Sequence, residues 1–402
     1  MNLVSKLRKF LPQQSSSQPT GARGSINLDP FLQGQEVSTP FGPCYVKEKY
    51  FPLAERHDKY FLKQVLGTTY DNLYLFGQSK KDSFRIENAL FLDTETTGLA
   101  GGTGTYAFLV GLGFFTPTHF VVKQLLMRDY NEELALLYLL DQELRRRDTI
   151  ISFNGKSFDL PLLQTRFTLS RLGLEGPVGK HHLDLLHMSR RLWRHKLESC
   201  SLGSLEEHIL GVRRTDDIPG FEIPQRYFDF LQTGDGSLLV NILEHNVIDI
   251  ISMATLLFRI HLTTELEPAE CDCPYEAEAL ASLALVAEKQ RLALHFLEAA
   301  SQLAEEQTQY VRVIRQSAAI YKRLKEYEQA ALLWKKLLKL ESGDLAAAEE
   351  LAKYYEHRAK DLSGAEQVTR RALAIAWQSR SPKIPALEHR LKRIQGKRSV
   401  TI

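Results

Sequence analysis

The order of apolar runs restricts the fold of the central part of the chain. Three runs of strand type come first, and the second and third meet at Pro117, which predicts a hairpin. Helical and strand patterns then alternate. The predicted strands are residues 88–93, 105–115, 118–127 and 149–155, and the predicted helices are residues 131–147 and 158–172. A hairpin followed by alternating strands and helices predicts a mixed α/β sheet with flanking helices.

The C-terminal third differs in pattern and composition, because strand patterns are absent from it and Ala, Leu, Glu and Lys are in excess. Residues 327–340 and 362–376 align with Ala330 over Ala365, a period of 35 residues. A period near 34, with small residues where two helices pack closely, resembles the tetratricopeptide repeat (TPR). An irregular helical bundle is the alternative. We expect TPR-like helical repeats over residues 275–397.

The segments before the predicted sheet carry no recognisable chemistry. The stretch QQSSSQPTGARG is polar and contains Ser, Gly and Pro, so we expect residues 1–34 to be disordered. Residues 35–87 begin with apolar runs around a Gly-Pro turn and predict an N-terminal extension with short strands. The predicted sheet domain then spans residues 88–264.

Composition narrows the class of protein. Four cysteines in 402 residues are too few and too scattered for a disulfide framework, and we expect a cytoplasmic protein. We expect no apolar stretch that approaches the roughly 20 residues needed to cross a membrane, and therefore no membrane partner. A net charge of +2 neither indicates nor excludes a nucleic-acid partner.

Two carboxylates, Asp93 and Glu95, follow the first predicted strand in the stretch LFLDTETTGLAGG. We expect them to converge on one site only where the strand ends, and Thr96, Thr97 and Gly98 supply a turn there. Two acids at this place are a poor structural element unless a cation neutralises them. The alternative is an exposed strand end with solvated acids.

Further acids stand at the starts and faces of predicted helices. Asp159 begins a helix five residues after Asn154, and its alternative role is a simple helix cap. Asp249 lies in an apolar helix with His245 four residues earlier on the same face, and its alternative is an ordinary exposed acid. Four carboxylates from these elements can hold two divalent cations about 3.5–4 Å apart, which drives phosphodiester hydrolysis. Oxygen ligands favour Mg²⁺ or Mn²⁺.

The motifs DTETTGL, NGKSFDLP and HNVID, in this order, resemble the three exonuclease motifs of the DEDD (DnaQ-like) superfamily. With HHLDLLHMSRRLW, SLGSLEEHILGVRR and DDIPG, the pattern is similar to bacterial YprB/MrfB-type proteins, which carry helical repeats behind a nuclease domain. The resemblance covers roughly residues 35–380. It implies a ribonuclease H-like fold with a mixed five-stranded sheet.

The same resemblance implies a two-metal-ion 3′→5′ exonuclease that acts on nucleic acid, DNA in preference to RNA. It further implies a bacterial DNA-repair protein, a helicase as a partner, and a protein partner at the TPR-like domain. Two rival hypotheses stay open. One is a scaffold protein with an inactive nuclease fold, although the presence of all four acids argues against it. The other is an RNA-processing nuclease with the same metal chemistry.

Site residues follow from the resemblance position by position. The implied metal-binding and catalytic acids are Asp93, Glu95, Asp159 and Asp249. His245 stands four residues before the last acid, the spacing of the tyrosine subclass, and Glu244 stands at the spacing of the histidine subclass. His245 is therefore either a catalytic base, a water-orienting group or a packing residue. The implied substrate contacts are Thr96, Thr97, Gly98, Leu99, Asn154, Lys156 and Ser157.

Weaker signals lie between the second and third motifs. Asp184 is expected to cap a helix, and Asp216 and Asp217 to shape the turn before Pro219. A basic run could face a nucleic-acid backbone or could be a solvated helix face. It comprises His181, His182, His187, Arg190, Arg191, Arg194, His195 and Lys196.

Overall fold

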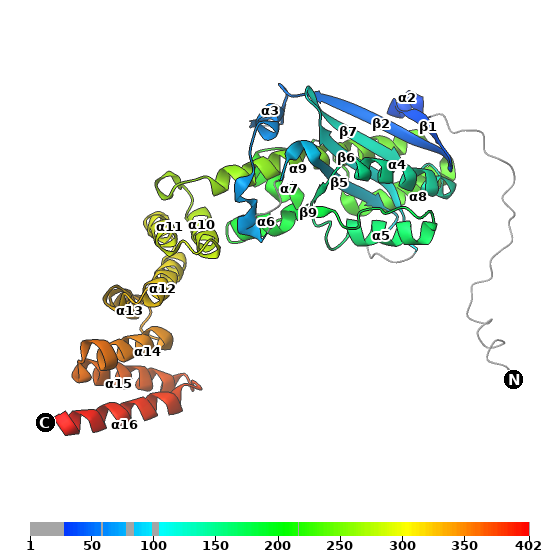
Figure 1. Cartoon of the computed structure of the whole chain (residues 1–402). Coiled ribbons are helices and arrows are strands. Elements are labelled where there is room, and N and C mark those ends of the chain that lie inside the picture. The colour runs from blue at the N-terminus through cyan, green and yellow to red at the C-terminus, as the bar shows by residue number, and fades with distance from the viewer. Residues whose placement is uncertain (1–27, 58, 78–83, 99–103, 216, 402) are drawn as a thin grey trace, which may run out of the picture.

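A seven-stranded sheet forms the centre of the N-terminal part of the computed structural model, in the order β1-β2-β7-β6-β5-β8-β9 (Figure 1). The structure describes residues 28–57, 59–77, 84–98, 104–215 and 217–401. The strands are β1 (Gln35–Thr39), β2 (Gly42–Pro52), β5 (Ala89–Thr96), β6 (Ala107–Phe115), β7 (His119–Leu126), β8 (Thr149–Ser152) and β9 (His181–Asp184). Strands β5, β8 and β9 pair in parallel, and the other pairs are antiparallel.

The predicted mixed sheet with flanking helices is confirmed, and the sheet is wider than expected. Five strands, β7-β6-β5-β8-β9, come from the predicted sheet domain. Strands β1 and β2 come from the N-terminal extension, and β2 pairs with β7 over eight residues from Tyr45 to Pro52. The sheet therefore has seven strands instead of five, because the extension adds two at the β7 edge.

Helices cover both faces of the sheet. Helices α4 (Glu133–Arg145), α5 (Asp159–Ser170) and α8 (Ile223–Thr233) share one apolar core with Leu90 and Leu92 of β5. Helix α6 (Leu185–Trp193) and most of the long helix α9 (Val240–Thr264) share the other core with Phe91 of the same strand. Alternate residues of β5 are thus buried on opposite faces, which is why this strand is apolar at consecutive positions.

The long helix α9 passes the length and composition test for a membrane span. With the turn before it, Gly236–Thr264 contains an 18-residue window with a mean hydropathy of 1.4, which corrects the expectation that no stretch is long and apolar enough. However, 67% of this window is buried inside the protein. Its apolar residues pack on the sheet, and this burial is typical of a core helix.

Short elements complete the sheet domain. They are α2 (Asp29–Leu32), β3 (Arg56–His57), β4 (Tyr60–Phe61), α3 (Leu62–Leu66), α7 (Leu202–Leu205) and the short 3₁₀ or π turns η1 (Asp71–Phe76), η2 (Ile86–Asn88), η3 (Tyr130–Glu132), η4 (Glu206–Leu210), η5 (Gly220–Glu222) and η6 (Gly236–Leu239). Leu28 and Leu32 are buried in the core on the α4 side, so the expected disorder up to residue 34 is wrong for these residues. Residues 1–27 of that prediction lie outside the described residues.

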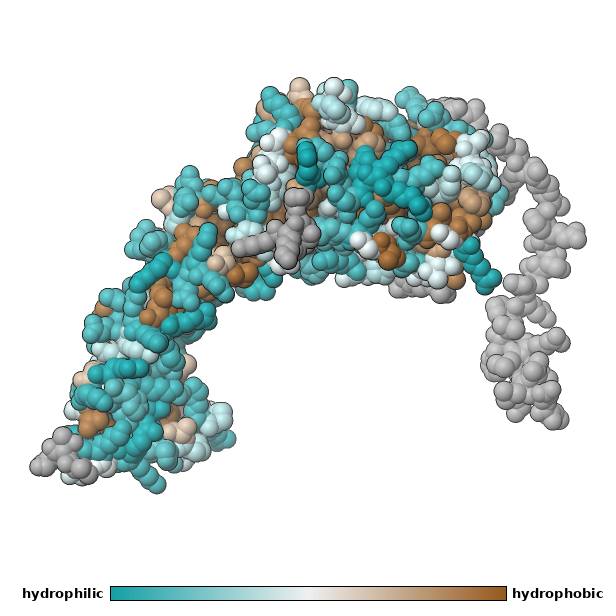
Figure 2. All heavy atoms as spheres, viewed as in Figure 1, coloured by the Kyte–Doolittle hydropathy of each residue, from teal (hydrophilic) through white to brown (hydrophobic). Residues whose placement is uncertain are grey.

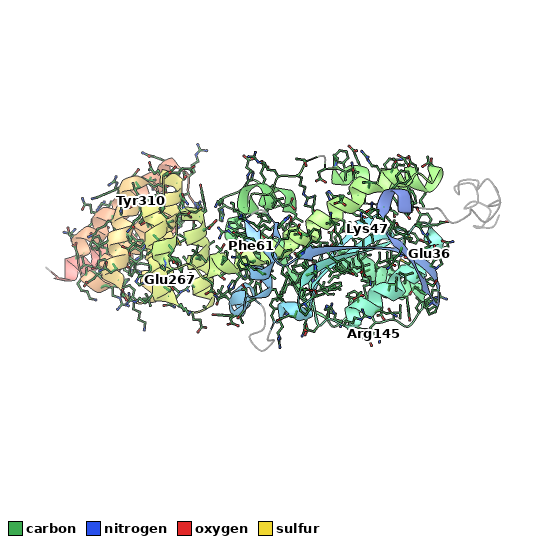
Figure 3. The ribbon with its side chains drawn as sticks, turned by 90° about the horizontal axis from the view of Figure 1, so that it is seen from above. Glu36, Lys47, Phe61, Arg145, Glu267 and Tyr310 are labelled. Atoms are coloured by element: carbon green, nitrogen blue, oxygen red, sulfur yellow. The ribbon has the colours of Figure 1, made fainter. Side chains whose placement is uncertain are left out.

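The C-terminal region is all-helical, as predicted, and extends away from the sheet domain (Figures 1 and 3). Its helices are α10 (Pro274–Val286), α11 (Gln290–Leu303), α12 (Gln307–Arg323), α13 (Tyr327–Leu340), α14 (Leu345–Tyr354), α15 (Leu362–Gln378) and α16 (Ile384–Thr401), with the turns η7 (Pro268–Glu270) and η8 (Tyr355–Ala359). Ala330 and Ala365, aligned by the sequence period, are both fully buried. The visible face of this region is largely hydrophilic (Figure 2).

The first helical pair shares its core with the sheet domain. Apolar residues of α10 and α11 belong to the same buried cluster as those of α6 and α9. Glu276 of α10 is 2% exposed and accepts hydrogen bonds from Trp193 Nε1 at 3.1 Å and Lys196 Nζ at 2.8 Å. The α10–α11 pair is therefore a continuation of the sheet domain's core, and the helices that follow extend from it.

Candidate active site

Asp93 and Glu95 lie on one face of β5. Side chains alternate along a strand, so residues two apart point the same way. Phe91, two residues before Asp93, packs in the core under α9. β5 ends at Thr96, so both acids lie at its C-terminal end as expected, but their alternation along the strand already directs them to one face and the turn is not needed to bring them together. The register of β5 with β6 shifts between Glu95 and Thr96, a bulge of the kind that re-aims a side chain.

Helix α9 brings Asp249 and His245 to Glu95. One ligand atom from each of these three residues lies within 4.8 Å of the other two. His245 Nε2 is 3.6 Å from Asp249 Oδ2, as the four-residue spacing predicted. Glu244, the other position considered, instead pairs with Lys49 Nζ of β2 at 3.0 Å. Thus the structure places His245, and not Glu244, at the acid cluster.

Two glycines of β6 let α9 approach the sheet closely. A Cβ atom on Gly111 would lie 2.1 Å from Asn246 Oδ1, and one on Gly113 would lie 2.4 Å from Ile250 Cγ2. Asn246 is fully buried, and its Nδ2 donates to Asp93 Oδ2 at 2.8 Å. The glycines therefore set the distance between the helix and the sheet, and with it the position of the α9 side chains relative to Asp93.

Asp159 joins the cluster from the first residue of α5. Phe158 occupies the capping position of this helix, so Asp159 is not its N-cap. The Asp159 carboxylate is 5% exposed, and Thr94 Oγ1 donates to it at 2.5 Å. A Cβ atom on Gly155 would lie 2.2 Å from Ser152 Oγ and 3.3 Å from Asp159 Oδ2. The glycine in the NGKSFD motif thus allows the chain to fold back tightly beside this carboxylate.

The carboxylates repel one another in a partly buried place. Burial, then the charges of Asp249 and Asp159, raises the pKa of Asp93 well above its ordinary value. Burial, then the charge of Asp93, raises the pKa of Glu95 well above its ordinary value. Burial raises the pKa of Asp159 to about 6, although the hydrogen bond from Thr94 lowers it. Such an arrangement costs free energy unless protons or cations neutralise it.

The donor set fits divalent cations. Glu95, Asp249 and His245 offer two carboxylates and an imidazole to one position. Asp93 and Asp159 lie beside this group, hydrogen-bonded to Asn246 and Thr94, and add carboxylate oxygens to the same charged neighbourhood. Carboxylates are ligands that Mg²⁺ and Mn²⁺ prefer. The sequence predicted His245 as a base or water-orienting group, whereas the structure also places it among possible ligands.

A cation that the sequence analysis did not indicate stands against the acids. Arg214 donates to Asp249 Oδ1 and, through Nε and Nη2, to the two oxygens of Glu206 at 2.6 Å each. Burial lowers the pKa of Arg214, but the bond with Glu206 and the charge of Asp249 outweigh it and hold this pKa above the ordinary value. The signal available in the sequence was the charged stretch EEHILGVRR, which has no catalytic spacing of its own.

Asp217 also belongs to the site. Its Oδ1 accepts a hydrogen bond from His245 Nδ1 at 2.7 Å, and its Oδ2 lies 3.2 Å from Arg214 Nη1. Burial raises the pKa of Asp217, but the hydrogen bond from His245 outweighs it and lowers this pKa. The sequence predicted that Asp217 would shape a turn. The structure shows that it also orients the ring of His245; its neighbour Asp216 lies outside the described residues.

The predicted substrate-contact residues divide into two groups. Thr96 Oγ1 donates to the Gly98 carbonyl at 2.9 Å, and Thr97 Oγ1 accepts from the Tyr106 amide at 3.0 Å, so both hydroxyls support the turn after β5. Leu99 lies outside the described residues. The side chains that remain exposed beside Asp159 are those of Asn154, Lys156 and Ser157.

Asp184 organises the loop that carries these exposed side chains. It caps α6 by accepting from the Leu186 amide at 3.1 Å, which confirms the predicted capping role. Its two oxygens also accept from the backbone amides of Asn154 at 2.9 Å and Lys156 at 3.0 Å. The start of α6 is thereby tied to the loop before Asp159.

Comparison with known proteins agrees with this geometry. Residues 90–260 match a family model of the RNase_H superfamily, and this range contains α5, most of β5 and α9, and all four acids. The chain is 33% identical over 382 residues to the uncharacterized protein YprB of Bacillus subtilis (strain 168), covering 93% of this chain and 90% of that protein. The chain belongs to the YprB family. Its YprB-type similarity extends beyond the sheet domain into the helical region, because the matched length is more than twice that of the RNase H-like segment. An RNase H-like domain with an acidic cluster indicates a nucleic-acid hydrolase.

Proposed function

We propose that this protein is a metal-dependent 3′→5′ exonuclease of the DEDD type that removes nucleotides from the end of a nucleic-acid strand. The observation that carries the proposal is the meeting of Glu95, His245 and Asp249 within 4.8 Å, next to Asp93 and Asp159. Buried acids with raised pKa values, on elements held by dedicated hydrogen bonds, are characteristic of a functional site. We infer that the acids take two divalent ions, Mg²⁺ or Mn²⁺.

In this proposal, the four acids bind the divalent ions and fix the positions of those ions. When bound, two divalent ions activate the attacking water and stabilise the leaving oxygen of a phosphodiester. Asn246 fixes Asp93, and Thr94 fixes Asp159, so neither carboxylate can swing freely. Such second hydrogen bonds hold a ligand in position and are the usual support of a metal site.

In this proposal, His245 takes a proton from the attacking water or orients that water. A carboxylate oxygen of Asp217 at 2.7 Å holds the proton on Nδ1, which leaves the lone pair of Nε2 facing Asp249. Arg214 keeps a fixed positive charge beside the same carboxylate, because Glu206 binds its guanidinium at two points. A phosphate oxygen that enters the cluster would meet this charge.

The remaining assignments concern biology. We infer a cytoplasmic DNA-repair role with a helicase as a partner, in line with the family resemblance. The buried small residues Ala330 and Ala365 at a 35-residue period support TPR-like repeats, whose surface would receive a protein partner. DNA is the preferred substrate in this proposal, and RNA processing is the alternative that the following experiment separates.

The test uses purified full-length protein with Mn²⁺ or Mg²⁺ on 5′-labelled single strands of DNA and RNA, each blocked in turn at one end. A ladder that shortens from the 3′ end, stops at a 3′ block and is stronger on DNA supports the proposal. Asp249→Asn should lose the ladder. Glu244→Gln is the matched control, because Glu244 lies on the same helix but pairs with Lys49 away from the cluster. Hydrolysis that ignores a 3′ block would overturn the polarity, and no hydrolysis with either ion would favour the scaffold hypothesis.

A further inference from the structure

The exposed face of α6 is a stripe of positive charge. Helix α6 buries Leu186, Met188, Leu192 and Trp193, and its outer face, continued by the two residues after the helix, carries His187, Arg190, Arg191, Arg194 and His195. These positions follow the three- and four-residue spacing that places side chains on one side of a helix. We call these five residues the α6 stripe.

The buried acids of the neighbouring helix α10 are neutralised by residues outside the α6 stripe. Residues 185–197 contain no aspartate or glutamate, and the first acid after the stripe is the exposed Glu198. On the neighbouring helix α10, Glu276 is bound by Trp193 and Lys196, and both oxygens of Glu278 are bound by Arg312 at 2.7 Å. Within the described residues, Arg190 and Arg194 form no ion pair with a carboxylate. The stripe therefore presents net positive charge to solvent.

The stripe runs from the acid cluster toward the helical region. The start of the stripe is tied to the loop before Asp159, because Asp184 caps α6 and accepts hydrogen bonds from the amides of Asn154 and Lys156. Its far end lines a hollow of about 280 Å³ at the junction with α10 and α12, where the lining includes Arg191, Arg194, His195, Ser282 and Gln316. In Figure 1, α6 lies between the sheet and α10. The stripe thus connects the candidate active site with the first helical pair.

We propose that the α6 stripe binds the phosphates of the nucleic-acid strand whose end lies in the active site, and leads the strand to the junction with α10. The proposal rests on the proposed function for the identity of the strand. A nine-residue helix is about 13 Å long at 1.5 Å per residue, which is long enough to contact a few consecutive phosphates of one strand. Guanidinium groups bind phosphate oxygens in a fork, and the stripe contains no exposed Phe, Tyr or Trp ring on which a base could stack. Binding through this surface is therefore independent of base sequence and equal for DNA and RNA.

The experiment measures binding without hydrolysis, so that it does not depend on the catalytic proposal. Full-length protein in EDTA is titrated into a fluorescent 20-nucleotide DNA or RNA strand at several salt concentrations. Arg190→Gln/Arg194→Gln removes two stripe charges. Lys339→Gln/Arg371→Gln removes two exposed charges of α13 and α15 and is the matched control. Counterion release gives a slope of about −0.7 per phosphate contact on a single strand, so two lost contacts should reduce the salt slope by about 1.4.

The expected result is about 25-fold weaker binding of the stripe variant at 0.1 M salt, because a slope change of about 1.4 acts over the tenfold range up to 1 M. The control variant should bind like the unmodified protein, and DNA and RNA should respond alike. An unchanged salt slope in the stripe variant, or an equal loss in the control, overturns the proposal. Poly-glutamate that displaces the strand at equal charge would also overturn it, in favour of an acidic protein partner. If the stripe variant loses binding but the unmodified protein hydrolyses no strand with Mn²⁺, the stripe stands and the proposed exonuclease fails.

Discussion

Gly111→Ala should damage the candidate active site through a single added methyl group. The new Cβ atom would lie 2.1 Å from Asn246 Oδ1, 2.6 Å from Nδ2 and 2.7 Å from Cγ. An ordinary contact needs at least 3.4 Å, so the amide must move by about 1.3 Å. Asn246 is fully buried and therefore cannot turn out into solvent.

The displaced amide holds the side chain of Asp93 on β5. Asn246 Nδ2 donates to Asp93 at 2.8 Å, and its Oδ1 accepts from Gln124 Nε2 at 2.9 Å. Overpacking costs about 1–3 kcal/mol, and a buried group left without its partner costs about 1–3 kcal/mol. We expect a loss of about 2–4 kcal/mol in the free energy of unfolding. A displacement near 1 Å at a reacting group can also lower the rate about 100-fold.

Urea unfolding and hydrolysis of an end-labelled strand measure the two effects. Gly203→Ala is the control, because a Cβ atom there meets nothing within 4 Å and alanine favours the short helix α7, in which this residue lies. Asn246→Ala removes the obstructing amide, so in that background Gly111→Ala should cost little stability, while activity stays low in the double variant. A Gly111→Ala protein with unmodified stability and rate would refute the role assigned to Gly111, Asn246 and Asp93.

Three further predictions concern the acids, protons and domain order. Alanine at Asp93, Glu95, Asp159 or Asp249 should nearly abolish hydrolysis, while circular dichroism shows an intact fold. A double variant should be little worse than a single one, because the acids act as a unit. A folded single variant with normal turnover would show that the substituted acid does not belong to the site. The folded-state pKa of Asp159 is raised to about 6 from its ordinary 3.8, so its contribution to stability is full below pH 3.8 and is lost as pH rises through 6. Melting temperatures in EDTA should therefore favour Asp159→Asn increasingly over the unmodified protein across that range, and a constant difference would contradict the raised pKa. Ending the chain after residue 326 keeps the residues of α12 that belong to the shared core and the partner Arg312 of Glu278, and should leave a folded, active protein. Ending it after residue 274 uncovers the core shared with α10 and leaves Lys196 and Arg259 without Glu276, at a cost of about 3–5 kcal/mol. Equal denaturation midpoints for the two truncations would refute the shared core.

The elements that carry the acids were predictable because their patterns are local. Residues 88–93, 105–115 and 118–127 are apolar runs that only a covered sheet can bury, and the structure has β5, β6 and β7 there. His245 and Asp249 share a helical face by spacing alone, and α9 presents them together. The joining of β1 and β2 to the same sheet could not be predicted, because strand pairing across more than 60 residues leaves no local pattern.

The supporting residues of the site were hidden for the same reason. Asn246 lies inside the HNVID motif, but its partner Asp93 is 153 residues away in the chain. In the sequence, Gly111 is an ordinary small residue of a strand, and its role follows only from the close approach of α9. A sequence motif identifies groups with chemistry, whereas the groups that hold them are chosen by three-dimensional packing and carry no spacing rule of their own.

Arg214 is an example of a residue whose role follows from three-dimensional packing and not from a sequence motif. By residue type it is one more charge in a loop, yet it touches Asp249 and is bound at two points by Glu206, which is itself 1% exposed. A buried acid that fixes an arginine against another acid has no reason to exist for stability alone, since apolar residues of similar volume are often as stable. The pair makes sense if a positive charge must stay beside Asp249 while the charge of the cluster changes as ions and phosphate come and go. The positions of Glu206 and Arg214 are thus explained by the chemistry of the neighbouring acids, and Arg214 and Asp217, which lie between η4 and α8, belong to the candidate active site.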